Sequence, residues 1–182
     1  MPPRQPRPER SRMVLPRRWL ITDERLGERL PAAIERLGPG GGIVFRHYSL
    51  GKRERRALFD RVRAAHSGLL LLAGQASQAA IWGADGSHGP GRGTGLRSAP
   101  VHSYAQIRAA ERNGAALLFL SPVFATRSHP EARPLGLARF AWLARRTQLP
   151  AIALGGKDEA RGKRLASFGA HGWAGIDAWT KD

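Results

Sequence analysis

The chain contains no cysteine, so disulfide bonds, thiolate zinc sites and thiol nucleophiles are all excluded. It also lacks a hydrophobic run long enough to cross a bilayer, because "GLLLLAG" and "AALLFL" fall far short of the roughly 20 residues that a spanning helix needs. A membrane partner is therefore not expected. Acidic residues are scarce as well: 14 Asp and Glu stand against 30 Lys and Arg, which leaves a formal net charge of +16.

A positive excess of this size predicts anionic partners, either phosphorylated small molecules or nucleic acid. The sequence contains no recognisable nucleic-acid-binding module, and arginines spread over solvated helix faces explain the charge more simply. A phosphorylated small-molecule ligand is therefore the stronger expectation, and a nucleic-acid partner the weaker one.

Residues 1–16 differ in composition from the rest of the chain. The stretch "MPPRQPRPERSRM" is rich in Pro and Arg, lacks the apolar segment of a signal peptide, and has too many prolines for an amphipathic transit helix. We expect residues 1–16 to form a disordered basic tail, and residues 17–182 to form one domain of a cytoplasmic protein. A homo-oligomer is compatible with the sequence.

After residue 16, short apolar runs alternate with segments of helical spacing. We expect strands at 19–22, 42–46, 69–72, 84–87, 98–103, 115–121, 150–156 and 171–175. Between strands, apolar residues share one helix face at positions 30, 34 and 37, and again at 58, 62 and 65. Eight such strand–helix units predict an α/β fold, a compact TIM (β/α)8 barrel, with a flavodoxin-like open sheet as the alternative. Only five residues follow Asp177, so we expect the final helix to be vestigial or missing.

The stretch "GSHGPGRGTG" at residues 86–95 contains five glycines, yet it is not a Walker phosphate loop. It has no Lys, and its last glycine is followed by Leu96. Nor does the chain contain a Ser-His-Asp, paired-carboxylate or HExxH pattern that would indicate a hydrolase or a zinc enzyme.

Seven segments, read in order, resemble the thiamine-phosphate synthase family and its thiazole-tautomerase (TenI) relatives. They are "RWLITDERL" (18–26), "IVFRHYSLGKRE" (43–54), "GADGSHGPG" (83–91), "VHS" (101–103), "LSPVFATRSHP" (120–130), "PAIALGG" (150–156) and "GAHGWAGIDAW" (169–179). They are similar to the family's LYLITD, Q-x-R-x-K, ADG-V-H-L-G-Q, S-x-H-S, G-P-V-F-x-T-x-S-K, P-V-V-A-I-G-G and G-A-D-G-V-A-V-I-S segments. The resemblance covers nearly everything from residue 19 onward, and it implies a TIM barrel.

The resemblance also implies a reaction of thiamine biosynthesis. In this family a thiazole phosphate is joined to hydroxymethylpyrimidine diphosphate, and Mg²⁺ on carboxylates, with Lys and Arg, neutralises the leaving pyrophosphate. The residues that match the family's thiazole-phosphate cradle are Thr126, Ser128, Gly155, Gly156, Gly175 and Ile176. Asp177 stands where the family has Ser, which puts a carboxylate beside this cradle.

The diphosphate end departs from the family pattern. Arg46 matches the family's diphosphate-facing Arg, but Val44 and Tyr48 replace its Gln and Lys. The family's Asn-Asp pair falls within residues 73–75 of this chain and is replaced there. The family's acidic residue after G-Q is replaced by Arg92 or by the glycine that follows it. Mg²⁺ prefers carboxylate oxygens, so we assign no metal ligand and no cofactor, and take Arg92 as a candidate anion contact in place of the metal.

Three residues are candidates for catalysis: Arg46, His102 at a strand end, and His129, which replaces the Lys of the T-x-S-K motif. The tautomerase His is replaced by Pro122, and His88 is expected to mark the rim of its strand. Three kinds of function remain open from the residues: a divergent synthase, a non-catalytic or regulatory barrel that binds a phosphorylated ligand, and a basic protein associated with nucleic acid.

Overall fold

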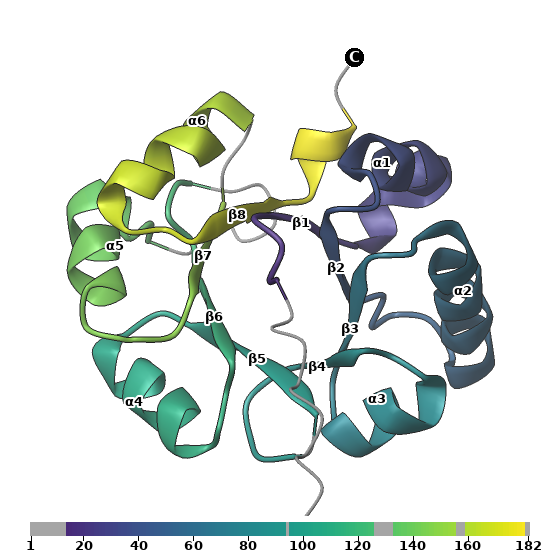
Figure 1. The fold of residues 1–182 in the computed structure, drawn as a ribbon. Helices are drawn as coiled ribbons and strands as arrows, with labels where there is room; N and C mark the ends of the chain where they lie inside the picture. The colour runs from purple at the N-terminus through teal and green to yellow at the C-terminus, as the bar shows by residue number, and fades with distance from the viewer. Residues whose placement is uncertain (1–13, 94, 126–132, 156–158, 181–182) are drawn as a thin grey trace, which may run out of the picture.

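The computed structural model describes residues 14–93, 95–125, 133–155 and 159–180. Eight parallel strands pair in chain order, and β1 pairs with β8 to close the barrel (Figure 1). They are β1 (Arg18–Ile21), β2 (Gly42–Phe45), β3 (Leu69–Ala73), β4 (Gly86–His88), β5 (Leu96–Val101), β6 (Leu117–Leu120), β7 (Ala151–Leu154) and β8 (Gly172–Gly175). The TIM-barrel prediction is confirmed, and the closed ring excludes the flavodoxin-like alternative.

Each apolar run predicted as a strand overlaps one of these strands, because strands of a helix-covered parallel sheet are buried on both faces. The run at 84–87 starts too early: β4 begins at Gly86, so Asp85, which falls inside the predicted run, precedes the strand. Its Oδ2 accepts hydrogen bonds from the Leu70 amide and from Arg63 Nη1, both at 2.7 Å. Asp85 therefore lies at the amino end of the barrel.

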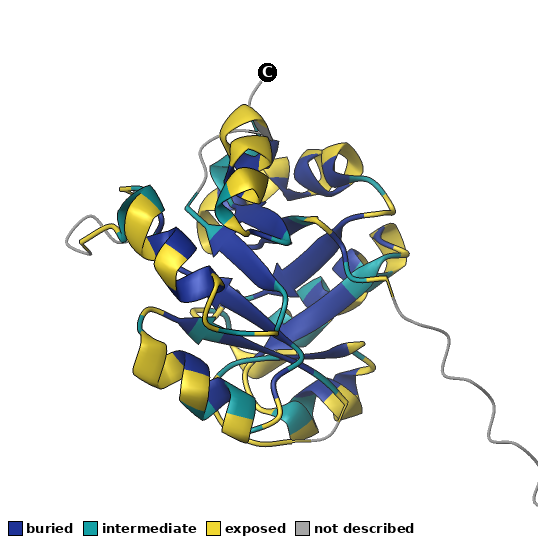
Figure 2. Ribbon diagram, turned by 60° about the vertical axis from the view of Figure 1, so that its left-hand side comes forward, coloured by how far each residue is buried: buried dark blue, intermediate teal, exposed yellow. Residues whose placement is uncertain are grey.

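Helices cover the outside of the ring and turn their polar faces to solvent (Figure 2). They are η1 (Glu24–Arg29), α1 (Leu30–Leu37), α2 (Lys52–Ala65), α3 (Ala76–Trp82), α4 (Tyr104–Arg112), α5 (Gly136–Ala144), α6 (Glu159–Arg164), η2 (Leu165–Phe168) and η3 (Asp177–Trp179), where η marks a 3₁₀ helix. No helix in the described ranges is long and apolar enough to cross a membrane.

The predicted inner face of α1, at positions 30, 34 and 37, is buried as expected. The face predicted for α2 is partly wrong, because Val62 is buried together with Phe59 while Ala65 is exposed. The Phe59 ring packs edge-on against Phe45 of β2 with centroids 5.5 Å apart, so the largest apolar side chain of α2 decides which side faces the sheet.

The connection between β4 and β5 breaks the strand–helix alternation. Seven residues join His88 to Leu96, and the described ones, 89–93 and 95, contain no helix (Figure 1). The expectation of eight strand–helix units is wrong here, because a crossover helix needs a connection of about a dozen residues or more. After β8, the described chain adds only η3, as expected for a vestigial final helix.

Alternate residues of each strand point to the barrel axis and fill it. The interior cluster contains Trp19, Ile21, Val44, Leu71, Ala73, Leu117, Phe119, Ile152 and Ala174. His88 stands edge-on to the Phe119 ring with centroids 5.0 Å apart, and its Nδ1 lies 2.8 Å from Ser98 Oγ. Burial, and after it the positive charge of Arg46, lowers the pKa of His88 to about 4. This imidazole is therefore neutral near pH 7.

The first described residues contact the base of the barrel. Leu15 packs against the interior cluster, and its carbonyl accepts a hydrogen bond from His171 Nε2 at 3.1 Å. The carbonyl of Pro16 accepts one from Trp19 Nε1 at 2.8 Å. Leu15 and Pro16, which the sequence assigned to the tail, are therefore packed on the domain. Residues 1–13 of that assignment lie outside the described residues.

Deletion of residues 2–13 should leave the midpoint of thermal unfolding within about 2 °C of that of the full chain, because a Pro- and Arg-rich segment offers the barrel little apolar surface. Deletion of residues 2–16 also removes the Leu15 side chain and two carbonyl acceptors, and should lower the free energy of unfolding by about 2–3 kcal/mol. Thermal and urea unfolding of both truncated chains measures the difference. Equal stability of the two would contradict the packing of Leu15 and Pro16.

His88 should make the barrel less stable in acid. The pKa of this imidazole is 6.5 without the fold and about 4 within it, so between these pH values the unfolded chain binds a proton that the folded chain does not. Lowering the pH through this window should therefore reduce the free energy of unfolding, by about 3 kcal/mol from this group alone.

Urea unfolding of the wild type and of His88→Gln at several pH values between 7 and 4 tests this effect. The loss of stability in acid should be smaller in His88→Gln, whereas His102→Gln, in which an exposed ring is replaced, should retain the full loss. A His88→Gln variant with the same loss in acid as the wild type would show that His88 is not the group responsible.

Candidate functional site

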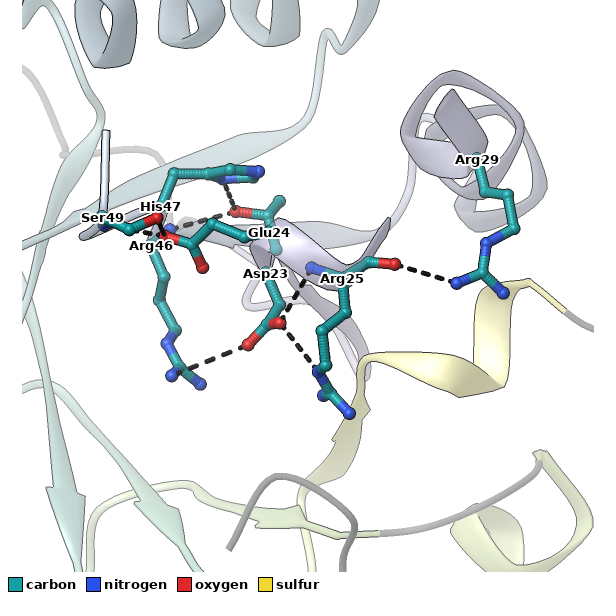
Figure 3. Close-up of polar contacts among 8 residues, drawn as sticks. Asp23, Glu24, Arg25, Arg29, Arg46, His47 and Ser49 are labelled. Atoms are coloured by element: carbon teal, nitrogen blue, oxygen red, sulfur yellow. Dashed lines mark hydrogen bonds and ion pairs between the residues drawn. The ribbon is translucent and has the colours of Figure 1, made fainter. Parts of the chain in front are cut away.

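Three charged side chains meet at the carboxyl ends of β1 and β2, the end of the barrel where (β/α)8 sites lie. Asp23 is 8% exposed; its Oδ1 accepts a hydrogen bond from Arg25 Nε at 2.8 Å, and its Oδ2 lies 3.8 Å from Arg46 Nη2. Figure 3 shows both guanidinium groups directed at this carboxylate. We call these three residues the mouth cluster; their formal charges sum to +1.

The carboxylate of the mouth cluster is ionised at neutral pH. Burial alone would raise the pKa of Asp23, but the hydrogen bonds from Arg25 and the charges of Arg25 and Arg46 outweigh it and hold that pKa below its usual value. An ionised Asp23 between two cations fixes both guanidinium groups while cancelling only one of their charges. The cluster can therefore still attract an anion.

The backbone around Arg46 is tied to the end of β1. Thr22 Oγ1 accepts a hydrogen bond from the Arg46 amide at 3.0 Å and lies 3.0 Å from Nδ1 of His47. His47 is buried, and its backbone adopts the left-handed conformation with φ 41°. Glu24 Oε1 accepts bonds from the amide and the hydroxyl of Ser49, both at 2.9 Å (Figure 3). These contacts direct the Arg46 side chain toward the mouth.

Arg55 of α2 joins the ends of β2 and β3 from the outer side. Its Nε donates to the Arg46 carbonyl at 2.9 Å, and its Nη2 donates to the Ala73 carbonyl at 2.7 Å. The guanidinium also lies over the Tyr48 ring, 5.4 Å from the centroid. Tyr48, which replaces the family Lys, thus stacks on a cation instead of supplying one.

His102 follows β5, across the ring from Arg46, and is exposed. Its Nδ1 lies 2.5 Å from the Ser121 carbonyl at the end of β6, and its amide donates to Gln106 Oε1 at 2.6 Å. With Nδ1 held by a carbonyl, the ring presents Nε2 as its second polar atom. The structure thus places His102 and Arg46 on the same end of the barrel, as the sequence predicted.

The predicted thiazole-phosphate cradle is described only in part. Gly155 follows β7 with φ 111°, a conformation that side chains rarely adopt, and Gly175 ends β8, followed by half-buried Ile176. β8 lies next to β1, so these residues flank the mouth cluster. The other predicted residues, Thr126, Ser128, His129 and Gly156, lie outside the described residues, and their roles stay predictions.

Arg92 does not join the mouth cluster. Its Nε donates to Asn113 Oδ1 at 3.3 Å, and Asn113 caps the carboxyl end of α4 in the outer layer. Helices of a barrel run opposite to its strands, so this end of α4 lies away from the mouth. Arg92 therefore lies on the outer wall of the barrel, and its contact with an anion stays a prediction.

Sequence reasoning missed Asp23 and Arg25 as site residues, although both follow the first strand within the segment "LITDER". The rule that functional side chains follow strand ends would have indicated Asp23. Arg55 carried no such signal, because it lies inside an amphipathic helix whose inward-turned positions depend on packing.

The described residues do not fit the magnesium site of the family. No carboxylate occurs at 73–75 or at 89–93, and Asp23 is engaged by two guanidinium groups. No group of three or more His, Asp or Glu side chains that could hold a metal ion occurs in the described ranges. Asp85, which is nearest in sequence to these loops, lies at the opposite end of the barrel.

Comparison with known proteins identifies the family to which this barrel belongs. The chain is 33% identical to "Putative thiamine-phosphate synthase 2" of Aquifex aeolicus, over 90% of this chain and 97% of that protein. A thiamine-phosphate synthase of Chloroflexus aurantiacus is 31% identical over 47% of this chain and 40% of its own length. The solved thiamine phosphate pyrophosphorylase of Pyrococcus furiosus superimposes with a TM-score of 0.77 at 23% identity, covering 91% of this chain and 88% of that one. The family model described as thiamine monophosphate synthase matches residues 19–179, and the chain belongs to that family.

Proposed function

We propose that this protein is a divergent thiamine-phosphate synthase that binds a thiazole phosphate at the barrel mouth and joins it to hydroxymethylpyrimidine diphosphate. The observation that carries the proposal is the mouth cluster, a net-positive group of two guanidinium ions and one carboxylate at the strand ends of a member of this family. Anionic substrates that carry phosphate groups match that charge.

The transfer requires the bond between the pyrimidine methylene carbon and the diphosphate oxygen to break. The electron pair leaves with pyrophosphate, and the thiazole nitrogen supplies the pair for the new carbon–nitrogen bond. Arg46 and Arg25 stabilise the charge that develops on the leaving oxygen, as guanidinium groups do for phosphates elsewhere. Asp23 holds both groups in position before the substrate arrives.

A second candidate is a non-catalytic barrel that binds the same phosphorylated ligand. The specific observation in its favour is that the described residues offer no magnesium site, although the family uses this ion against pyrophosphate. The two candidates differ in one respect only, namely whether bound substrates are converted. The excess of Arg over acidic residues remains the single observation that favours nucleic acid.

Calorimetric titration with thiazole phosphate, hydroxymethylpyrimidine diphosphate and thiamine phosphate, followed by a turnover assay, separates these candidates. Binding of the thiazole phosphate with formation of thiamine phosphate supports the synthase. Binding without turnover, with or without Mg²⁺, supports the non-catalytic barrel. Failure of all three compounds to bind would contradict both.

Arg46→Ala should lower kcat/KM of the transfer by about 10²–10³, because one guanidinium that stabilises the leaving pyrophosphate is lost. If substrates are bound but not converted, the same variant should weaken binding of hydroxymethylpyrimidine diphosphate. Arg53→Ala, which removes an exposed arginine of α2, is the matched control and should behave as the wild type. The rate should change little across a series from EDTA to excess Mg²⁺.

Wild-type turnover and wild-type affinity in Arg46→Ala would remove the mouth cluster from the mechanism. A rate that collapses in EDTA and returns with Mg²⁺ would contradict a synthase that relies on guanidinium groups alone.

A further inference from the structure

A cavity of about 390 Å³ lies beside the connection between β4 and β5. Its walls are residues 74–77 at the start of α3 and residues 89–93, and two strand residues, Ser87 and Arg97, form its floor. The residues that line it include Arg92 but no carboxylate. The cavity exists because this connection has no helix to cover the strands (Figure 1).

The cavity is on the outside of the barrel. In β5, Ala99 and Val101 pack into the outer core beneath α4, and Arg97 precedes them at the two-residue spacing of side chains on one face. In β4, Ser87 pairs with Arg97, whereas the next residue, His88, points to the barrel axis. The cavity and the mouth cluster therefore lie on opposite faces of the sheet.

Arg97 is a buried cation that has no counter-ion among the described residues. The residue is only 5% exposed. Its Nη1 and Nη2 donate hydrogen bonds to the carbonyls of Asn113 and Gly91. No ion pair involving Arg97 occurs within the described ranges of the chain. Carbonyl oxygens satisfy hydrogen bonds but do not neutralise a charge, and burying an unpaired ion is costly. Three of the five guanidinium N–H groups remain for a further acceptor.

The loop that forms the second wall is shaped by its glycines. A Cβ atom on Gly93 would lie 2.2 Å from Cβ of Ala76, and Gly91 has φ 106°. Only glycine allows the loop to pass this close to α3 and turn in this way. Because glycines carry no side chain, the loop can approach α3 and still leave the space between them open, with Arg92 at its edge.

We propose that this cavity binds a phosphate group, either as free phosphate or as a phosphate monoester, through Arg97 and Arg92 with the hydroxyls of Ser77 and Ser87. Guanidinium groups favour phosphate because two parallel N–H groups match two oxygens. A dianion would neutralise the buried charge of Arg97 and the nearby charge of Arg92 together. The proposal does not depend on the reaction at the mouth, which lies on the other face of the sheet.

Amide NMR spectra of the full chain locate the site directly. Titration with inorganic phosphate should shift the resonances of Gly89, Gly91 and Gly93 and of the start of α3, in the wild type and equally in Arg46→Ala. A second titration uses methyl phosphate. If methyl phosphate binds more tightly than inorganic phosphate, the ligand of the cavity is a phosphate monoester; if inorganic phosphate binds more tightly, the ligand is the free ion. Shifts confined to the mouth, or abolished by Arg46→Ala, would overturn the proposal.

Charge-matched variants separate a built site from general attraction to a basic protein. Arg92→Gln removes an exposed arginine and should weaken phosphate binding about tenfold or more, as should Arg97→Lys, which keeps the charge but loses the paired N–H groups. Arg112→Gln removes one exposed charge from neighbouring α4 and should change affinity less than twofold. Equal weakening by Arg92→Gln and Arg112→Gln would contradict the site. The dispersion of the amide spectrum reports whether Arg97→Lys still folds.

Discussion

The barrel depends on the contact between two large rings at its axis. Trp19 of β1 and Phe119 of β6 are both fully buried, and they meet edge to face with centroids 5.4 Å apart. Because the interior is close-packed, these rings share it with side chains of mixed size, from Leu117 and Ile152 down to Ala73. A Cβ atom on Gly42 would come within 2.4 Å of the Trp19 ring, so the neighbouring strand must carry a glycine there.

The same tryptophan also connects the first described residues with η3. Its indole donates to the Pro16 carbonyl, and its own carbonyl accepts a bond from the Trp179 indole at 3.2 Å. Trp179 in turn stacks on Trp173 with an interplanar angle of 7°. The 3₁₀ helix η3 thus packs one large ring against the barrel and links the segment before β1 to the segment after β8.

The strand positions were predictable because most strands are short apolar runs in the sequence. Eight such runs in a chain of this length are compatible with few folds other than a (β/α)8 barrel. The sequence also offered a sign of the missing helix after β4, because the strands expected at 84–87 and 98–103 leave only ten residues between them. The strand-end rule could indicate Asp23, but it could not predict the ion pair with Arg46, because that pair joins the ends of two different strands. Arg92 shows the limit of matching a family pattern, because the residue keeps its place in the sequence while its side chain lies on the outer wall of the barrel.

Under the proposed function, guanidinium groups stand where the family uses a metal, and this changes what a phosphate site requires of its surroundings. A magnesium site needs several carboxylates, each of which would repel the substrate once the ion is absent. A guanidinium site needs only enough negative charge to hold its cations in place. Asp23 supplies this charge for Arg25 and Arg46, and the formal charges of the three residues sum to +1. At Arg97 no carboxylate of the described residues forms an ion pair, and two backbone carbonyls hold the cation. At both proposed sites, few acidic residues and several arginines thus go together, because guanidinium groups fixed by the fold would do there what a bound metal ion does elsewhere.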